Sequence, residues 1–293
     1  MMFLIERDRM KQNENIHRNF TLSQKSIVSI NIILFMNEDL AYFIGVMQTD
    51  GCFRLFNFKQ RKIWRLSLDV SDKSLPMLHR SLKIFNSTFN KKVSPYKRRK
   101  GGNPYGFQTS VNTLLSKFEE LDIKISGQLT PPNWILKNVK FFSSYLAGVI
   151  DGDGDVRIKR PKYPQCEIRI TCGIKPIILK KWIKNFLNCS VGIVKVTQKL
   201  LLPGAKKDYT TVYKLYFKAS SKNYEILKKV LSPNLTIYHK KQRLNLILNY
   251  LDKKISKHQL FNLYKKTLLR KPGWQNGHAT DLNMRVEAAE LVY

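Results

Sequence analysis

Two stretches of this sequence end in the same way, and they constrain the fold more than any other feature. Residues 40–51 are mostly apolar or small until they reach Asp50 and a glycine. Residues 145–154 repeat this pattern and end with Asp153 and a glycine. Each stretch predicts a buried helix, and its final acid faces the negative end of the helix dipole, where a cation is preferred. A feature that opposes stability at two matched positions indicates a paired acidic site.

The residues that follow each stretch predict the same series of elements, so the chain reads as two copies of one unit. Alternating apolar and polar residues predict strands, and amphipathic stretches predict helices. The first copy has expected strands at 52–59, 62–71, 91–97 and 105–111 and helices at 72–85 and 114–121; the second has strands at 155–159, 167–172, 191–199 and 212–218 and helices at 177–187 and 224–231. We therefore expect an α+β fold of two pseudo-symmetric αββαββα repeats with antiparallel sheets, and with the two acid-bearing helices packed at their interface.

Turn-forming residues at 130–133 indicate a linker between the copies. The expected organisation is an N-terminal extension (1–36), a first half (37–133), a second half (134–251) and a C-terminal extension (252–293).

The charge balance indicates a polyanionic partner. Lys and Arg outnumber Asp and Glu by 52 to 21, which gives a formal charge of +31, and so large an excess repels itself unless a polyanion offsets it. Nucleic acid is the expected partner. A membrane is not expected, because no apolar run reaches the roughly 18–20 residues needed to span a bilayer. Acids among the first 20 residues fit neither a secretory signal nor a transit peptide, so we expect the protein to act inside the cell, in the compartment where it is made. The abundance of Lys, Asn, Ile and Phe suggests an A+T-rich genome, which favours a mitochondrion or chloroplast if the source is eukaryotic.

The four cysteines show no C-x-x-C spacing and no neighbouring paired histidines. A zinc site or a disulfide framework is therefore not expected.

The polar faces of the expected strands carry mostly hydrogen-bond donors. A twisted antiparallel ribbon fits the major groove of DNA, whereas the alternative is an ordinary solvated sheet face. The loop at 97–100 adds a run of basic residues. The candidate DNA-binding residues are Arg54, Arg65, Ser67, Asp69, Lys97, Arg98, Arg99, Arg157, Lys159, Arg169, Thr171, Lys195, Thr197, Lys199, Lys214, Tyr216 and Lys218.

The paired acids suggest a metal-dependent chemistry. Small residues at Gly45, Ala147 and Gly148 would let the two helices approach closely and bring the acids together. Two such carboxylates repel unless a proton or a divalent cation lies between them. Oxygen ligands without nitrogen or sulfur favour Mg²⁺. Beside a phosphate backbone this predicts phosphodiester hydrolysis, with the glycine after each acid expected to allow a sharp turn.

Two simpler explanations of the acids compete with a metal site. Asp-Gly commonly marks a turn, but the same pair at the ends of two matched helices makes that explanation insufficient. The acids around Asp153 also imitate the start of an EF-hand loop, which needs glycine at its sixth position and glutamate at its twelfth. Those positions hold Val156 and Lys162, so a calcium loop is excluded.

The second motif, residues 146–154, resembles the signature of the LAGLIDADG homing endonucleases, and residues 43–51 resemble a more diverged copy of it. The resemblance implies a single-chain monomer that binds a long, asymmetric double-stranded DNA site and promotes the mobility of an intron or intein. It implies cleavage of both strands across the minor groove. It also implies two or three Mg²⁺ ions, replaceable by Mn²⁺, that are shared by Asp50 and Asp153. The main-chain carbonyls of Thr49 and Gly152 would assist.

The first motif departs from the family pattern at one position, where Gln48 stands in place of the earlier acid that the second motif keeps as Asp151. The resemblance gives this position a role in supporting the helix ends. Further catalytic candidates are Asp72, where the second expected strand meets a helix, and His239 and Lys240 after the last helix of the second copy. An RNA maturase that assists splicing of a host intron RNA, or a DNA-binding protein without cleavage, remains the alternative.

Overall fold

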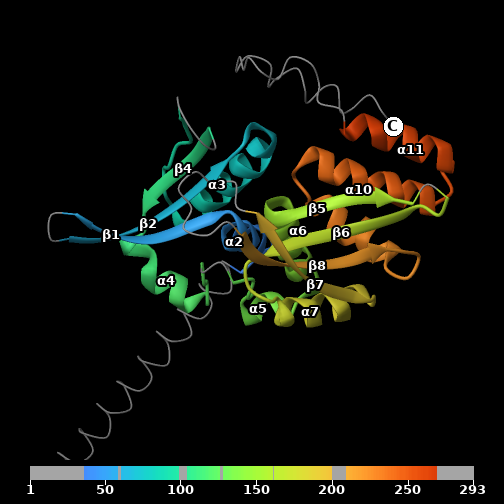
Figure 1. Ribbon diagram of the computed structural model, residues 1–293. Helices are drawn as coiled ribbons and strands as arrows, with labels where there is room; N and C mark the ends of the chain where they lie inside the picture. Colours follow the sequence, from blue (N-terminus) through green and yellow to red (C-terminus); the bar gives the residue numbers. More distant parts are fainter. Residues whose placement is uncertain are drawn as a thin grey trace, which may run out of the picture.

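The computed structural model describes residues 36–58, 61–98, 104–125, 128–160, 162–199 and 209–268 (Figure 1). Two four-stranded antiparallel sheets dominate these residues, with strand orders β1-β2-β4-β3 and β5-β6-β8-β7. The matching orders confirm the predicted α+β architecture of two αββαββα repeats. The expected N-terminal extension at 1–36 lies outside the described residues except for its last residue.

The first half contains one long sheet hairpin and three helical regions. Its elements are α2 (Glu38–Thr49), β1 (Gly51–Phe58), β2 (Arg61–Val70), η1 (Asp72–Ser74), α3 (Leu75–Phe89), β3 (Tyr96–Lys97), β4 (Tyr105–Ser110), η2 (Asn112–Leu114) and α4 (Leu115–Glu120). In β2 the even-numbered residues from Leu66 to Val70 are buried while the residues between them are partly exposed. One face of this sheet therefore packs on the helices and the other face is open.

The strand expected at 91–97 is shorter than predicted, because only Tyr96–Lys97 pair with a neighbouring strand. The side chain of Asn86 explains the difference: its amide nitrogen donates to the carbonyl of Val93, and its amide oxygen accepts from the backbone nitrogen of Val93, each at 2.9 Å. This double hydrogen bond holds the segment against α3 instead of in the sheet.

The second half repeats the order and then continues. Its elements are α5 (Asn133–Leu136), α6 (Val139–Asp153), β5 (Gly154–Lys159), β6 (Gln165–Cys172), α7 (Ile177–Leu187), β7 (Val191–Lys199), β8 (Tyr209–Ala219), α8 (Tyr224–Ile226), η3 (Leu227–Leu231), α9 (Ser232–Asn234), α10 (Tyr238–Leu251) and α11 (Lys257–Leu268). Helix α11 falls within the expected C-terminal extension. It packs against α10, and the side chain of Arg243 on α10 bonds to Thr267 of α11 (Figure 1).

Helices α2 and α6 lie side by side and form the most extensive helix contact among the described residues (Figure 1). Asparagine caps the amino end of each: the Asn37 side chain accepts from the backbone of Leu40, and the Asn138 side chain accepts from Lys140. From residue 40 to 48 every residue of α2 is buried, so this helix is covered on all sides. Such burial is expected of a helix that joins two sheets into one core.

No helix among the described residues has the length and apolar character of a membrane span.

Candidate active site

The site is built on the close approach of α2 and α6. A Cβ atom added to Gly45 would overlap the backbone oxygen of Tyr145, and one added to Gly148 would overlap the backbone oxygen of Tyr42. These glycines occupy equivalent places in the two motifs, and each receives the partner helix at its surface. Ala147, beside Gly148, is fully buried. The backbones therefore touch, and the carboxyl ends of the two helices converge.

This convergence brings the two acids to one place. Asp153 is the last residue of α6, and Asp50 is the residue that caps the end of α2. A Cβ atom added to Gly152 would overlap the Thr49 hydroxyl and would lie 3.4 Å from a carboxylate oxygen of Asp50. Asp50 thus lies against the residue that precedes Asp153. Both acids remain accessible to solvent.

The electrostatics of the two acids follow from this proximity. The pKa of Asp153 is raised to about 6, first because the carboxylate is partly removed from water and second because the charge of Asp50 lies nearby. Burial also raises the pKa of Asp50, and the nearby Lys240 ammonium opposes the rise at both acids. Two neighbouring carboxylates that repel each other bind a proton or a cation readily. Among the described residues no group of three or more His, Cys, Asp or Glu side chains is arranged to hold a metal ion.

The glycines after the acids serve close packing, which corrects the expectation of a sharp turn. Gly154 has an extended backbone that any residue adopts (φ −87°, ψ 156°). A Cβ atom at Gly154 would overlap the backbone of Ile150, and one at Gly51 would overlap the backbone of Met47. Each strand therefore leaves its helix too close to the preceding turn for a side chain to fit.

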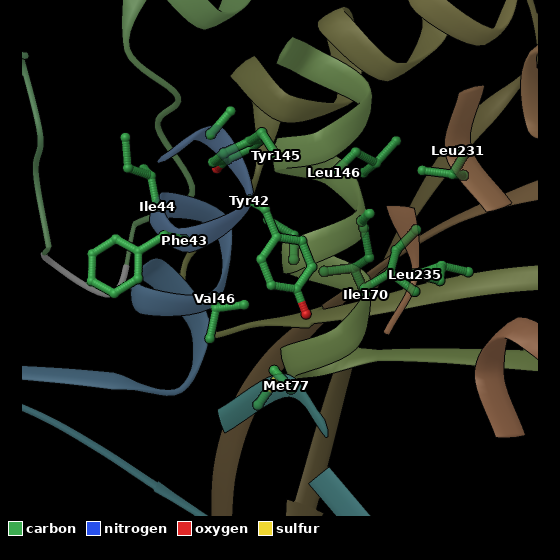
Figure 2. Close-up of a cluster of buried hydrophobic side chains, with 14 of the residues drawn as sticks. Tyr42, Phe43, Ile44, Val46, Met77, Tyr145, Leu146, Ile170, Leu231 and Leu235 are labelled. Carbon is green, nitrogen blue, oxygen red and sulfur yellow. The ribbon is translucent and has the colours of Figure 1, made fainter. Parts of the chain in front are cut away.

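The residue two positions before each acid is held by a reciprocal hydrogen bond. Tyr42 of α2 donates to Asp151 of α6 at 2.8 Å, and Tyr145 of α6 donates to Gln48 of α2 at 2.7 Å. Figure 2 shows both tyrosines in the core between the two helices. Neither Asp151 nor Gln48 faces solvent, since the two residues are 1% and 2% exposed. Both residues therefore have a structural position away from the open end of the site.

The remaining bonds of these two residues explain why they differ. Asp151 accepts hydrogen bonds from the backbone nitrogens of Thr236 and Ile237, at 2.7 and 3.2 Å. The Gln48 amide instead donates to the backbone oxygens of Lys124 and Thr130, at 2.8 and 2.9 Å. A carboxylate only accepts, whereas an amide nitrogen donates. The loop in each half thus requires the side chain that is present.

Lys240 is placed beneath the acids. The residue is 7% exposed, and its ammonium donates to the backbone oxygens of Ile150, Asp151 and Gly152, at 2.8, 2.7 and 3.2 Å. These carbonyls lie at the carboxyl end of α6, where a cation is favoured; the Ile150 oxygen also accepts from the backbone nitrogen of Gly154. All three donors of the ammonium are in use, which favours a positioning role over direct proton transfer. The Gly152 carbonyl predicted to bind metal is one of its acceptors.

His239 lies half-buried beside this lysine. Burial, followed by the charges of Arg243, Lys240 and Lys73, lowers the pKa of His239 to about 4. The imidazole is therefore neutral at physiological pH. Asp72, the other catalytic candidate, lies in η1 and is partly exposed.

Most of the candidate DNA-binding residues lie on the open faces of the two sheets, but the strand register places three of them on the opposite faces. Lys195 and Thr197 lie on the same side of β7 as Val191 and Ile193, whose partners Phe217 and Leu215 are buried. Lys97 pairs with Tyr105, which in turn pairs with the buried Val70. The register therefore corrects the prediction for these three residues.

In the second half, acids hold the basic side chains: Arg157 bonds to Asp155, and both Lys159 and Arg169 bond to Glu167. The other members of the predicted set on partly or fully exposed strand positions are Arg54, Arg65, Ser67, Asp69, Lys97, Thr171, Lys195, Thr197, Lys214, Tyr216 and Lys218. Arg99 and the side chain of Lys199 lie outside the described part of the chain.

A hollow on the open face of the first sheet contains residues that the sequence did not single out. It is lined by Cys52, Arg54, Phe56, Arg65, Ser67, Asp69, Arg98 and Gln108. Asp69 is held there by the Tyr96 hydroxyl at 2.5 Å and by Arg98 at 3.0 Å. Gln108 and Phe56 were missed, although the alternation of β4 and β1 gives the face to which each belongs.

No family model matches the sequence, and no curated protein matches it. Among solved structures the chain is similar to mesophilic variants of the homing endonuclease I-DmoI, at 19% identity and a TM-score of 0.45, over 67% of this chain and 96% of that chain. It is also similar to the meganuclease I-SmaMI bound to an uncleavable DNA, at 15% identity and a TM-score of 0.48, over 80% of this chain and 97% of that chain.

Proposed function

We propose that this protein is a sequence-specific DNA endonuclease of the LAGLIDADG homing type, which hydrolyses one phosphodiester in each strand of a long asymmetric site and so promotes intron or intein mobility. The observation that carries the proposal is the convergence of Asp50 and Asp153 at the ends of two touching helices. One acid comes from each half, so the site belongs to neither half alone. Such a site is suited to a substrate with two strands.

The two acids fit a hard divalent cation. Mg²⁺ is usually held by one or two carboxylates, with water and substrate phosphates completing its coordination, and Asp50 and Asp153 provide such carboxylates. When bound between enzyme and DNA, the cation would lower the pKa of an attacking water and stabilise the leaving oxygen. The proximity that raises the pKa of Asp153 to about 6 is the same repulsion that a cation relieves.

Other residues of the chain prepare this site. Lys240 fixes the last carbonyls of α6 and so orients the end of the helix that carries Asp153. Asp151 and Gln48 fix the loops that flank the two halves. None of these groups needs to touch DNA. Their contribution is a rigid frame that holds both carboxylates at the open end of the interface.

The open sheet faces and the positive charge of the protein indicate a DNA substrate. The strands that leave the acids, β1 and β5, run directly into the open sheet faces with their arginines and lysines. A DNA duplex with one phosphodiester bound at the acids would therefore extend along these faces. The formal charge of +31 favours a nucleic acid, and an antiparallel ribbon fits the major groove of B-DNA.

The proposal is tested by selecting and then cutting DNA. The purified full chain is incubated with a library of randomised DNA duplexes in EDTA, and the enriched duplex is then exposed to Mg²⁺. The expected result is cleavage of both strands that requires the metal, with Asp50→Asn and Asp153→Asn binding the duplex without cutting it. Lys181→Ala, an exposed position on α7, is the control and should cut normally.

Three outcomes would contradict the proposal. Wild-type protein that binds a specific duplex tightly and never cuts it would point to a DNA-binding protein. Preference for a structured RNA over every duplex would point to a maturase. Cutting that persists in both Asp variants would show that the chemistry lies elsewhere.

A further inference from the structure

The strands that begin at the two acids provide a common ruler for the two halves. Strand β1 starts at Gly51, which pairs with Leu68 of β2, and β5 starts at Gly154, which pairs with Ile170 of β6. Each subsequent residue pair lies about 3.3 Å farther from the acids. Positions on the two sheets can therefore be compared by the number of residues that separate them from the acid end.

Arg65 on β2 is held in a fixed position on the open face. Its guanidinium lies 4.4 Å from the centre of the Phe56 ring. The Gln108 amide, with its oxygen toward the arginine, accepts from Nη1 and Nε at 3.1 and 3.2 Å. Arginine has five N–H donors in a rigid fork, so several remain for a ligand. Because Arg65 pairs with Arg54, it stands three residues beyond the start of β1.

Arg169 on β6 is also held, but by a different partner. Its Nε donates to Glu167, a carboxylate that also accepts from Lys159 at 3.0 Å. The Arg169 side chain is 28% exposed, and its other four donors are not used by Glu167. Because Arg169 pairs with Asp155, it stands only one residue beyond the start of β5.

The two fixed arginines do not occupy equivalent positions. The registers place Glu167 of the second half where Arg65 stands in the first, and Ser67 of the first half where Arg169 stands in the second. Next to Ser67, at the same level, the first half has Cys52. The first hairpin therefore offers two short neutral side chains at the level where the second hairpin offers a fixed guanidinium.

A guanidinium that is fixed in this way suits guanine. Arginine bonds in a bidentate manner to the O6 and N7 acceptors of guanine in the major groove, and a contact of this kind discriminates strongly against other bases. Preorganisation of the side chain lowers the conformational entropy that binding would otherwise cost. Lysine lacks the planar fork and acts as a point charge.

We propose that Arg65 and Arg169 each select a guanine, one in each half-site, and that the guanine read by Arg169 lies about two base pairs closer to the cleavage positions than the guanine read by Arg65. Two residues along a strand span roughly 6.6 Å, and successive base pairs of B-DNA are about 3.4 Å apart. The target is consequently asymmetric in a defined way. This inference rests on the proposed function, because it assumes a DNA target read by the open faces.

The experiment compares selected target sequences among variants of the full chain. Wild type, Arg65→Lys, Arg169→Lys and Gln108→Ala are each used to enrich duplexes from a randomised library in EDTA. The cleavage positions of the wild-type site are mapped with Mg²⁺. Each Arg→Lys change is expected to lower the preference for guanine at one position by roughly tenfold or more and to leave the other positions unchanged. Gln108→Ala should weaken only the preference that depends on Arg65.

The possible outcomes distinguish a failure of the guanine assignment from a failure of the proposed endonuclease function. Loss of the inner guanine with Arg169→Lys and of the outer guanine with Arg65→Lys, in opposite half-sites, would support the assignment. Guanines at equal distances from the cut, or variants with unchanged base preference at every position, would overturn it while leaving an endonuclease. If wild type enriches no sequence at all, the proposed function itself fails, and the inference fails with it.

Discussion

The phenol of Tyr42 in the first half donates a hydrogen bond of 2.8 Å to the Asp151 carboxylate of the second half. Tyr145 makes the reciprocal bond to Gln48 at 2.7 Å. The two halves thus hold each other at the base of the acidic site through matching tyrosines and unmatched acceptors. The unmatched pair is the more informative, because each acceptor also satisfies a loop of its own half.

The Gln48→Glu variant is expected to be destabilised by about 2–4 kcal/mol, although the two side chains have the same size. The new carboxylate would face the backbone oxygens of Lys124 and Thr130, which now accept from the amide. Buried acceptors would lose their donor and meet a charge. Urea unfolding at pH 8 measures the loss, which should shrink at pH 4 as the new acid takes up a proton.

The matched control for that variant is Gln259→Glu. The Gln259 side chain accepts from the backbone of Ser256 at an exposed position, so a carboxylate fits there and stability should change by less than about 0.5 kcal/mol. Equal losses in the two variants would mean that the donor bonds of Gln48 do not matter.

Removing one carboxylate from the site is expected to stabilise the metal-free protein while abolishing cleavage. The pKa of Asp153 is raised to about 6 in the folded chain, above the roughly 3.9 of an unfolded aspartate. The unfolded chain therefore loses this proton at a lower pH than the folded chain. The ionised acid thus opposes folding increasingly between about pH 4 and pH 6, and fully above that range.

Asp153→Asn should accordingly gain roughly 1–2 kcal/mol over wild type at pH 8 in EDTA, a figure reduced for the solvent exposure of the acid. The gain should disappear near pH 4. Addition of Mg²⁺ should stabilise wild type but not the variant. Thermal melts at the two pH values, with and without the metal, measure these differences; a variant less stable than wild type at pH 8 would contradict the electrostatic argument.

Lys240→Met tests whether this lysine positions the site. Methionine keeps most of the buried stem but removes the ammonium that donates to the carbonyls of Ile150, Asp151 and Gly152. We expect a loss of about 2–3 kcal/mol and weaker binding of Mg²⁺ near neutral pH, because the ammonium helps to keep Asp50 and Asp153 ionised. Unfolding and metal titration supply the readouts. Unchanged stability with complete loss of cutting would instead identify Lys240 as a catalytic group.

His239 is expected to make the folded state sensitive to acid. Its pKa is about 4 in the folded chain and about 6.5 in an unfolded chain, so the unfolded chain binds the proton first as pH falls. The stability supplied by the neutral imidazole is complete above pH 6.5 and is lost toward pH 4. His239→Gln should flatten this part of the stability profile by roughly 1–2 kcal/mol, allowing for partial solvent exposure. Parallel pH profiles of the two proteins would refute the expectation.

The sequence predicted the parts of the fold that depend on local pattern. The repeated pattern of helix, acid and glycine predicted the duplication. The alternation of apolar and polar residues in the strands predicted the open faces that carry Arg65 and Arg169. Small residues at Gly45 and Gly148 gave the close helix contact, since only a missing side chain permits backbones to touch. These features are written in residues that are near each other in the chain.

The parts that the sequence did not reveal depend on distant partners. Nothing near Gln48 indicates that the carbonyls of Lys124 and Thr130 require its amide. Lys240 was predicted to be a catalytic candidate, and only the folded end of α6 shows which carbonyls accept from its ammonium. Gln108 gained its role through pairing of β4 with β2 beside Arg65. The strand expected at 91–97 is shorter than predicted for the same reason, because the Asn86 side chain on α3 forms hydrogen bonds with the backbone of Val93.

The most direct test of the account is strand-specific cleavage of the selected duplex by wild type, Asp50→Asn and Asp153→Asn in Mg²⁺, with each strand labelled separately. The account predicts that wild type cuts both strands and that either variant, although it still binds, loses double-strand cutting. Double-strand cutting at the wild-type rate by either variant would contradict the claim that one acid from each half forms the active site.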